Sequence, residues 1–155
     1  MAIESSPNLM LTSVQRAYNA FLALENIDSS DRSQGIEAIA QGISNAFDDI
    51  LEANTLDLEM SREMAVPDLL IDWLKLTPER LQDLVDLLNR LAEVPDRVQR
   101  VFHTPYPLGG SQTYGQLMPL GVIALIYETF PELGAIAAGF CLKTGNSLIL
   151  RGCSS

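Results

Sequence analysis

The chain has 155 residues and a mass of 17.0 kDa, which suits one domain and argues against a complete two-domain enzyme. Hydrophobic residues make up 47% and charged residues 19%, a composition that predicts a packed core and excludes a disordered acidic tail. The formal net charge of -10 and the pI of about 4.4 leave no basic surface for a phosphate backbone, so we expect no nucleic-acid partner.

Two cysteines, Cys141 and Cys153, are too few for the disulfide framework of a small secreted domain. Residues 1–11 contain no basic stretch followed by an apolar one, so they do not have the pattern of a secretory signal. We therefore expect a cytoplasmic protein.

The chain changes character between residues 95 and 115. Residues 1–96 carry 18 acids and 6 bases, whereas residues 97–155 carry 2 acids and 4 bases. Eight of the ten glycines lie in the later part, beyond residue 108. These shifts predict a helical segment over 1–96, a connecting arm over 97–118 and an apolar α/β segment over 119–155.

Apolar residues recur at three- and four-residue steps from 36 to 51, with acidic residues between them. This pattern predicts one amphipathic helix that starts near the cap signal Ser29-Ser30. We expect its apolar stripe to pack against other helices and its acidic face to be solvated. The stripe comprises Ile36, Ile39, Ala40, Ile43, Phe47, Ile50 and Leu51.

Residues 77–79 (Thr-Pro-Glu) combine a cap, a first-turn proline and an acid, which predicts another amphipathic helix that runs to Pro95. Less regular patterns predict helices over 14–24 and 67–76. Farther along, residues 106–116 contain two adjacent glycines and form either a hairpin or a flexible crossing segment.

Residues 120–127 (LGVIALIY) form a continuous apolar run, which predicts a strand buried on both faces. Small apolar residues over 132–142 predict a helix, residues 144–146 (Thr-Gly-Asn) a turn, and residues 147–150 a second strand. Together they predict a parallel β-α-β unit, the building block of doubly wound nucleotide-binding sheets.

The alternative interpretation of residues 117–142 is a membrane segment. Charged residues and prolines interrupt this stretch before about 18 uninterrupted apolar residues accumulate, so we expect no transmembrane helix. The interrupting residues are Pro119, Glu128, Pro131 and Glu132.

Two blocks of sequence resemble the gamma-glutamyl phosphate reductase family, also called glutamate-5-semialdehyde dehydrogenase. Residues 118–128 (MPLGVIALIYE) and 143–152 (KTGNSLILRG) are similar, in order and spacing, to the family's strand-and-turn pattern and its following "LK-GNA-ILRGG". Residues 50–59 (ILEANTLDLE) and 76–96 look like two earlier family segments. The resemblance spans nearly the whole chain and corresponds to the N-terminal portion of the family.

This resemblance implies an aldehyde dehydrogenase-like fold, with N-terminal helices that lead into the first β-α-β of a Rossmann-type NADP-binding domain. It also implies a strand arm for oligomerisation, and hence a homo-oligomer. The family reduces L-glutamyl 5-phosphate with NADPH to glutamate 5-semialdehyde in proline biosynthesis, and uses a nucleophilic cysteine in a separate catalytic domain. Family members are more than twice as long as this chain, so we expect an N-terminal fragment without turnover of its own.

Neither cysteine matches the nucleophile of the family. Cys141 lies in the apolar helix and is expected to be a core residue, whereas Cys153 stands where the family usually has a glycine. His103 has no cysteine or carboxylate at motif spacing. We therefore expect neither a catalytic nor a metal-binding residue in this chain.

The expected cofactor site lies where the first strand ends and the helix begins, because backbone N–H groups and the helix dipole face the crevice there. Glu128, Thr129 and Pro131 occupy this turn. The resemblance places Arg151 at the end of the next strand, beside the adenosine ribose, where its guanidinium suits a 2′-phosphate and so NADP. Ser154 would add a hydroxyl group.

Lys143, Gly145 and Asn146 also match the family motif, and Lys143 joins the candidate cofactor residues. We favour a turn-forming role for this segment, in which Gly145 or Asn146 adopts a positive φ. Phe130 is a departure, because the family usually has arginine at that position. Loss of this cation would weaken binding of an anionic ligand about tenfold or more, which puts the substrate of this chain in question.

A second hypothesis is a shortened paralogue that acts as an interaction or assembly module. The acidic helical half and the nearly uncharged C-terminal half motivate it. Two parallel strands expose open edges and apolar faces, and such surfaces favour a protein partner.

Overall fold

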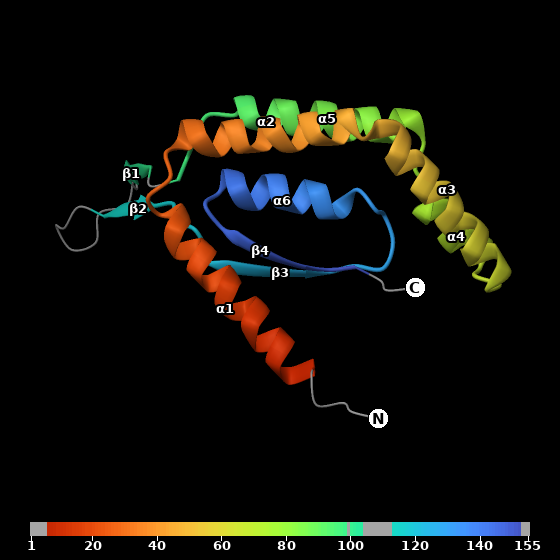
Figure 1. Ribbon diagram of the computed structural model, residues 1–155. Coiled ribbons are helices and arrows are strands. Elements are labelled where there is room, and N and C mark those ends of the chain that lie inside the picture. Colours follow the sequence, from red (N-terminus) through yellow and green to blue (C-terminus); the bar gives the residue numbers. More distant parts are fainter. Residues whose placement is uncertain (1–5, 99, 104–112, 153–155) are drawn as a thin grey trace.

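The computed structural model describes residues 6–98, 100–103 and 113–152. Two layers of helix cover one face of a parallel pair of strands (Figure 1). Helices α2 and α5 lie side by side, and α6 lies between this pair and strands β3 and β4. The elements are α1 (Ser6–Leu24), α2 (Ser29–Asn45), α3 (Phe47–Glu63), α4 (Asp68–Leu74), α5 (Pro78–Glu93), β1 (Val101–His103), β2 (Tyr114–Gln116), β3 (Val122–Ile126), α6 (Leu133–Lys143) and β4 (Ser147–Arg151).

The apolar stripe over 36–51 belongs to two helices, so the prediction of one continuous helix was wrong. Helix α2 begins at Ser29 as expected, but Ala46 leaves helical geometry with φ -101° and ψ 18° and separates α2 from α3. Phe47 and Ile50 in the first turn of α3 still pack against the same core. The stripe therefore continues across the break, and periodicity alone does not reveal it.

Helix α5 has the N-terminal cap and the buried apolar stripe that its sequence predicts. The Thr77 hydroxyl accepts a hydrogen bond from the Arg80 amide at 3.2 Å, which satisfies one of the free N–H groups of the first turn. The apolar side of α5 then forms most of the core together with Ile36 and Ala40 of α2. The core residues that α5 supplies are Leu81, Leu84, Val85, Leu88, Leu91 and Ala92.

Helix α6 packs closely on this core through a glycine. A Cβ atom at Gly139 would lie 2.6 Å from Leu88 Cδ2 and 3.1 Å from Leu91 Cδ2, which is closer than van der Waals contact allows. Ala135, Ile136 and Leu142 of α6 add further apolar contacts. The small-residue composition of α6 thus lets it approach α5 at short distance.

Strands β3 and β4 are parallel, and their register runs from Val122 opposite Ser147 to Ile126 opposite Arg151. This confirms the predicted β-α-β unit. The expectation that the first strand is buried on both faces was wrong, because Leu120 is 87% and Ile126 77% exposed. Helix α6 covers one face, while α1 lies mainly against β4 and leaves the other face of β3 open.

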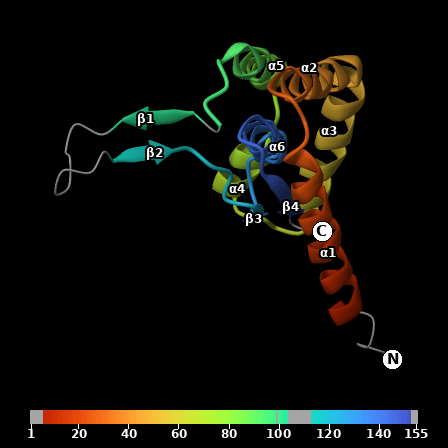
Figure 2. The same cartoon turned by 90° about the vertical axis from the view of Figure 1, so that its left-hand side faces the viewer.

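Strands β1 and β2 pair in antiparallel fashion, with Phe102 opposite Gly115. Figure 2 shows that they project away from the helices. Their side chains face solvent, His103 among them. The adjacent glycines 109 and 110 lie outside the described residues. The domain boundaries expected from composition stay a prediction.

Candidate functional site

The carboxyl ends of β3 and β4 bring together predicted site residues from separate parts of the chain. Arg151, the last residue of β4, pairs with Ile126, the last residue of β3. The Tyr127 amide continues this ladder and donates to the Arg151 carbonyl at 3.0 Å. Glu128 and Thr129 follow directly in the turn towards α6. Parallel strands therefore place the turn and the arginine at one edge of the sheet.

This edge presents one cation and one anion to solvent. The side chains of Arg151 and Glu128 are exposed, whereas those of Thr129 and Pro131 are half-buried. Within the described part of the chain, neither Arg151 nor Glu128 takes part in an ion pair. Both side chains are thus available for charge-assisted hydrogen bonds to a ligand.

The turn that carries these residues is held by an aromatic and ionic cluster. Phe130 adopts a positive φ of 58°, which is strained for a bulky side chain. Its ring stacks on Trp73 of α4 at a centroid distance of 5.6 Å, and the Arg80 guanidinium lies 5.9 Å from the ring centroid. Arg80 also forms an ion pair with Glu132. Sequence reasoning missed Trp73 and Arg80, because contacts between distant segments leave no periodic signal.

A cavity of about 350 Å³ opens beside this turn. Glu128, Thr129 and Pro131 form one wall, and α3 and α4 form the others. The helices contribute apolar side chains and one carboxylate, that of Asp57. Sequence patterns do not predict that Asp57 and Glu128 line one cavity, because they do not show where α3 and α4 pack.

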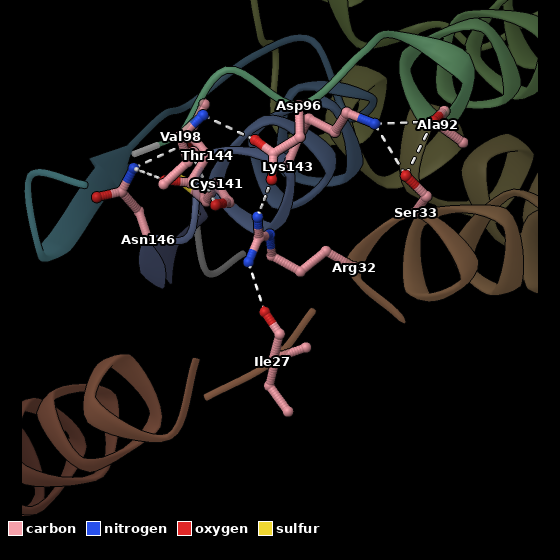
Figure 3. A network of polar contacts seen from close by, with 10 residues as sticks. All are labelled: Ile27, Arg32, Ser33, Ala92, Asp96, Val98, Cys141, Lys143, Thr144 and Asn146. Atoms are coloured by element: carbon pink, nitrogen blue, oxygen red, sulfur yellow. Dashed lines mark hydrogen bonds and ion pairs between the residues drawn. The ribbon is translucent and has the colours of Figure 1, made fainter. Parts of the chain in front are cut away.

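Lys143 lies at the opposite edge of the sheet, because α6 runs back from the ends of the strands to their beginnings. Its ammonium group is buried and donates to Ser33 Oγ at 2.9 Å and to the Ala92 carbonyl at 2.7 Å (Figure 3). It therefore ties α6 to α2 and α5. The structure does not bring Lys143 together with Glu128 and Arg151.

Arg32 continues this polar network. It forms an ion pair with Asp96 and donates to the Ile27 carbonyl at 2.6 Å. Asp96 also accepts a hydrogen bond from the Val98 amide at 2.8 Å. The network fixes the segment after α5 against the start of α2.

Gly145 and Asn146 determine the conformation of the turn between α6 and β4. Gly145 has a φ of 71°, which confirms the predicted positive φ in this turn. Asn146 is buried; its amide oxygen accepts from the Gly121 N–H at 2.8 Å, and its amide nitrogen donates to Thr144 Oγ1 at 2.8 Å. Asn146 thus locks the start of β4 to the start of β3.

Cys141 confirms the expectation of a core residue. It is buried on α6, and burial raises the pKa of its thiol above the ordinary value of 9.0. A thiol of this kind is a poor nucleophile at neutral pH. Cys153 and Ser154 lie outside the described residues.

The described residues contain neither a metal-binding cluster nor a membrane-spanning helix. No group of three or more histidine, cysteine or acidic side chains could hold a metal ion. None of the described helices combines the length and the apolar character that a bilayer crossing requires.

Curated relatives share the sequence over most of this chain. Gamma-glutamyl phosphate reductase 2 of Synechocystis sp. is 61% identical over 139 residues, which are 90% of this chain and 33% of the relative. Gamma-glutamyl phosphate reductase of Gloeobacter violaceus is 37% identical over 138 residues, 89% of this chain and 33% of the relative. No protein-family model matches the chain.

Solved structures show the same relationship. Gamma-glutamyl phosphate reductase from Saccharomyces cerevisiae superposes with a TM-score of 0.84 at 27% identity, over 92% of this chain and 36% of that one. The enzyme from Thermotoga maritima gives a TM-score of 0.80 at 27% identity, over 92% and 34%. PnpE in complex with nicotinamide adenine dinucleotide shares the fold alone, with a TM-score of 0.66 at 19% identity over 90% and 26%.

The chain spans about one third of the length of the curated relatives that it matches. Its helices and parallel β-α-β unit reproduce the matching part of the reductase structures. The chain therefore belongs, as an N-terminal portion, to the gamma-glutamyl phosphate reductase family of aldehyde dehydrogenase-like proteins.

Proposed function

We propose that this chain forms the cofactor side of a cytoplasmic, NADPH-dependent gamma-glutamyl phosphate reductase that acts in proline biosynthesis. The reaction would reduce L-glutamyl 5-phosphate to glutamate 5-semialdehyde. One observation carries the proposal: Glu128, Thr129 and Arg151 meet at the carboxyl edge of the parallel strands. The likeness to reductases over nearly the whole chain supports it.

The residues at this edge fit a dinucleotide phosphate. Arg151 offers an exposed guanidinium, and Gly152 directly follows it. Gly134 stands at the start of α6, where a Cβ atom would lie only 2.8 Å from the Tyr127 hydroxyl. A glycine at this position therefore leaves room for the tyrosine ring beside the helix. The nicotinamide of the cofactor would supply the hydride.

In this proposal the residues of the chain bind and orient. Arg151 would hold the 2′-phosphate, the group that distinguishes NADP from NAD. Glu128, Thr129 and Pro131 would line the crevice for the dinucleotide at the end of β3. Lys143 acts at the opposite edge as a structural residue, because its ammonium group is engaged by Ser33 and Ala92.

Calorimetric titration with NADPH and NADH tests the cofactor assignment. We expect saturable NADPH binding that Arg151→Ala weakens by about tenfold or more, with a smaller effect on NADH, because the lost interaction is charge-assisted. Arg90→Ala, which removes an exposed arginine from α5, is the control. Equal weakening of both cofactors would contradict the assignment of Arg151.

We further propose that the chain has no turnover by itself. It spans one third of its relatives, and Cys141, the cysteine among the described residues, is buried with a raised pKa. An assay of NADP-dependent oxidation of glutamate 5-semialdehyde should therefore detect no activity. Robust activity of the isolated chain would refute this part of the proposal.

The second candidate function is that of an interaction or assembly module. Exposed apolar side chains on and beside the sheet favour it, namely those of Leu120, Ile126 and Leu150. Size-exclusion chromatography with light scattering tests the assembly role. A strictly monomeric species would count against an assembly role.

A further inference from the structure

The β3–α6 turn is fastened by backbone hydrogen bonds at its two ends but not in its middle. The Tyr127 amide donates to the last carbonyl of β4 at 3.0 Å, and the Leu133 amide donates to the Phe130 carbonyl at 2.9 Å. Between these points, within the described part of the chain, no hydrogen bond involves Glu128 or Thr129. The positions of these two residues therefore depend on the conformation of Phe130, which follows them.

Phe130 has a backbone conformation that its place in the sequence disfavours. Its φ is 58°, in the left-handed region that bulky side chains rarely adopt. Pro131 follows it, and a residue before proline prefers extended geometry. Such a conformation persists only where the surrounding structure holds it. Contacts of the Phe130 ring must therefore offset the strain of its backbone.

Trp73 and Arg80 supply these contacts from two other elements. The Trp73 ring of α4 stacks on the Phe130 ring with an interplanar angle of 24°, and the Arg80 guanidinium faces the same Phe130 ring. Arg80 also donates to the carbonyl of Lys75, the residue that ends α4. One arginine in the first turn of α5 thus fastens both α4 and the Phe130 ring.

The ion pair with Glu132 fixes this arginine in turn. Glu132 stands at the start of α6 and is half-buried, and Arg80 pairs with its Oε1 atom. The other carboxylate oxygen, Oε2, is buried and has no hydrogen-bond partner among the described residues. A carboxylate in such a place is left uncompensated when it loses its cation, so the pair favours a fixed position of Arg80 beside Phe130.

We propose that Trp73 and Arg80 are positioning residues of the cofactor site, because they hold Phe130 in its left-handed conformation and thereby set the positions of Glu128 and Thr129. The consequence rests on the proposed function: the affinity for the dinucleotide depends on two residues that do not line the cavity beside the turn. The turn follows β3, so its effect is the same for NADPH and NADH, whereas Arg151 at the end of β4 distinguishes the two.

Two substitutions of Phe130 separate the effect of its backbone from that of its ring. Glycine adopts a positive φ without strain, whereas alanine keeps the strain and loses the stacking. In calorimetric titrations of the full chain, Phe130→Ala should weaken NADPH binding by about tenfold, and Phe130→Gly by no more than about threefold. If the ring contributed only packing, both variants would weaken binding equally, and this result would overturn the proposal.

Trp73→Ala removes the stacking from the other side. It should weaken binding of NADPH and NADH by about threefold to tenfold each, and Trp73→Phe, which keeps an aromatic ring, should restore most of the affinity. In the Phe130→Gly background Trp73→Ala should have no further effect, because no strain is left to offset. A loss of the same size in both backgrounds would overturn the proposal. Leu69→Ala, at an exposed position of the same helix, is the control and should leave binding unchanged.

Arg80→Lys tests the arginine. Lysine keeps the charge for Glu132 but lacks the planar fork that also reaches the Lys75 carbonyl and faces the Phe130 ring. We expect both cofactors to bind about threefold more weakly, while the circular dichroism spectrum stays unchanged. Arg90→Lys, on the exposed side of the same helix, is the matched control. An equal effect of the two substitutions would overturn the role of Arg80.

NMR spectroscopy keeps this proposal apart from the proposed function. A positive φ at Phe130 gives a strong NOE between its own amide and α protons, which Trp73→Ala should weaken while it shifts the amide resonances of Glu128 and Thr129. Normal NADPH binding with an unchanged turn in Trp73→Ala would overturn the positioning role alone. If the unaltered chain bound no NADPH, the cofactor assignment would fail, and the NMR comparison would still decide whether Trp73 sets the turn.

Discussion

Apolar side chains are buried in the helical core but largely exposed around the parallel strands. In the core formed by α2, α5 and α6, Ile36 and Leu88 are completely buried. Around β3 and β4, Leu120 and Ile126 keep most of their surface exposed, although the sequence there is equally apolar. Apolar composition therefore does not decide burial in this chain; the presence of a covering layer does.

The difference bears on where the candidate site lies. Arg151 and the β3–α6 turn belong to the open region, where backbone and side chains remain accessible to a ligand. Lys143 and Asn146 belong to the buried region, where hydrogen bonds within the chain satisfy their polar groups. The helical core thus acts as the rigid support, and the binding chemistry that we propose lies at the open edge of the sheet.

The largest effect that we predict is the loss of core packing in Leu88→Ala. Leu88 is fully buried and lies against Gly139 of α6, so truncation leaves a cavity between α5 and α6. We expect the free energy of unfolding to fall by about 2–5 kcal/mol. Urea denaturation followed by circular dichroism measures it. A loss below about 1 kcal/mol would show that the helical region is not the closed core described above.

Lys143→Met tests the polar side of the same core. Its ammonium group supplies hydrogen bonds to Ser33 and Ala92, and the Ala92 carbonyl lies in the last turn of α5, where a cation is favoured. The variant should lower the free energy of unfolding by about 1–3 kcal/mol. Lys75→Met, an exposed lysine, is the matched control. No change in stability would mean that Lys143 is free for another role, including contact with a cofactor.

Sequence signals predicted the elements where the cause is local. Short segments contain all the information for three features: the cap at Thr77, the apolar stripe of α5, and the succession of β3, α6 and β4. The rule that parallel strands share a carboxyl edge then brought Glu128 and Arg151 together. These features need no knowledge of distant contacts.

The missed features depend on contacts between remote segments. The break between α2 and α3 has only weak local signals, Asn45 before Ala46 and the acids Asp48 and Asp49 after it, while the apolar stripe continues across it. The partners of Lys143 lie 110 and 51 residues earlier in the chain. Trp73 meets Phe130 only after α4 has packed beside the β3–α6 turn. Periodicity reports which face is apolar, but not what covers it.

Thr77→Ala should produce a smaller loss, because it removes one capping hydrogen bond from α5. We expect the free energy of unfolding to fall by about 1 kcal/mol, and Thr77→Ser to restore most of it. A backbone hydrogen bond lowers the pKa of the Glu79 carboxyl, and a hydrogen bond with the same Thr77 hydroxyl lowers this pKa further. Carboxyl titration by NMR should therefore show a higher pKa of Glu79 in Thr77→Ala. An unchanged pKa would contradict this capping geometry.

The smallest effect is predicted for Ile126→Thr in the open region. Ile126 is 77% exposed, so its side chain loses little contact with water on unfolding, and threonine keeps the β-branched shape that suits a strand. The free energy of unfolding should change by no more than about 0.5 kcal/mol, measured at low protein concentration so that self-association does not contribute. A loss comparable to that of Leu88→Ala at low concentration would mean that a segment of the same chain covers β3, and would contradict the open face of this strand. A loss that appears only as the protein concentration rises would mean that a second copy covers β3, and would favour the second candidate function.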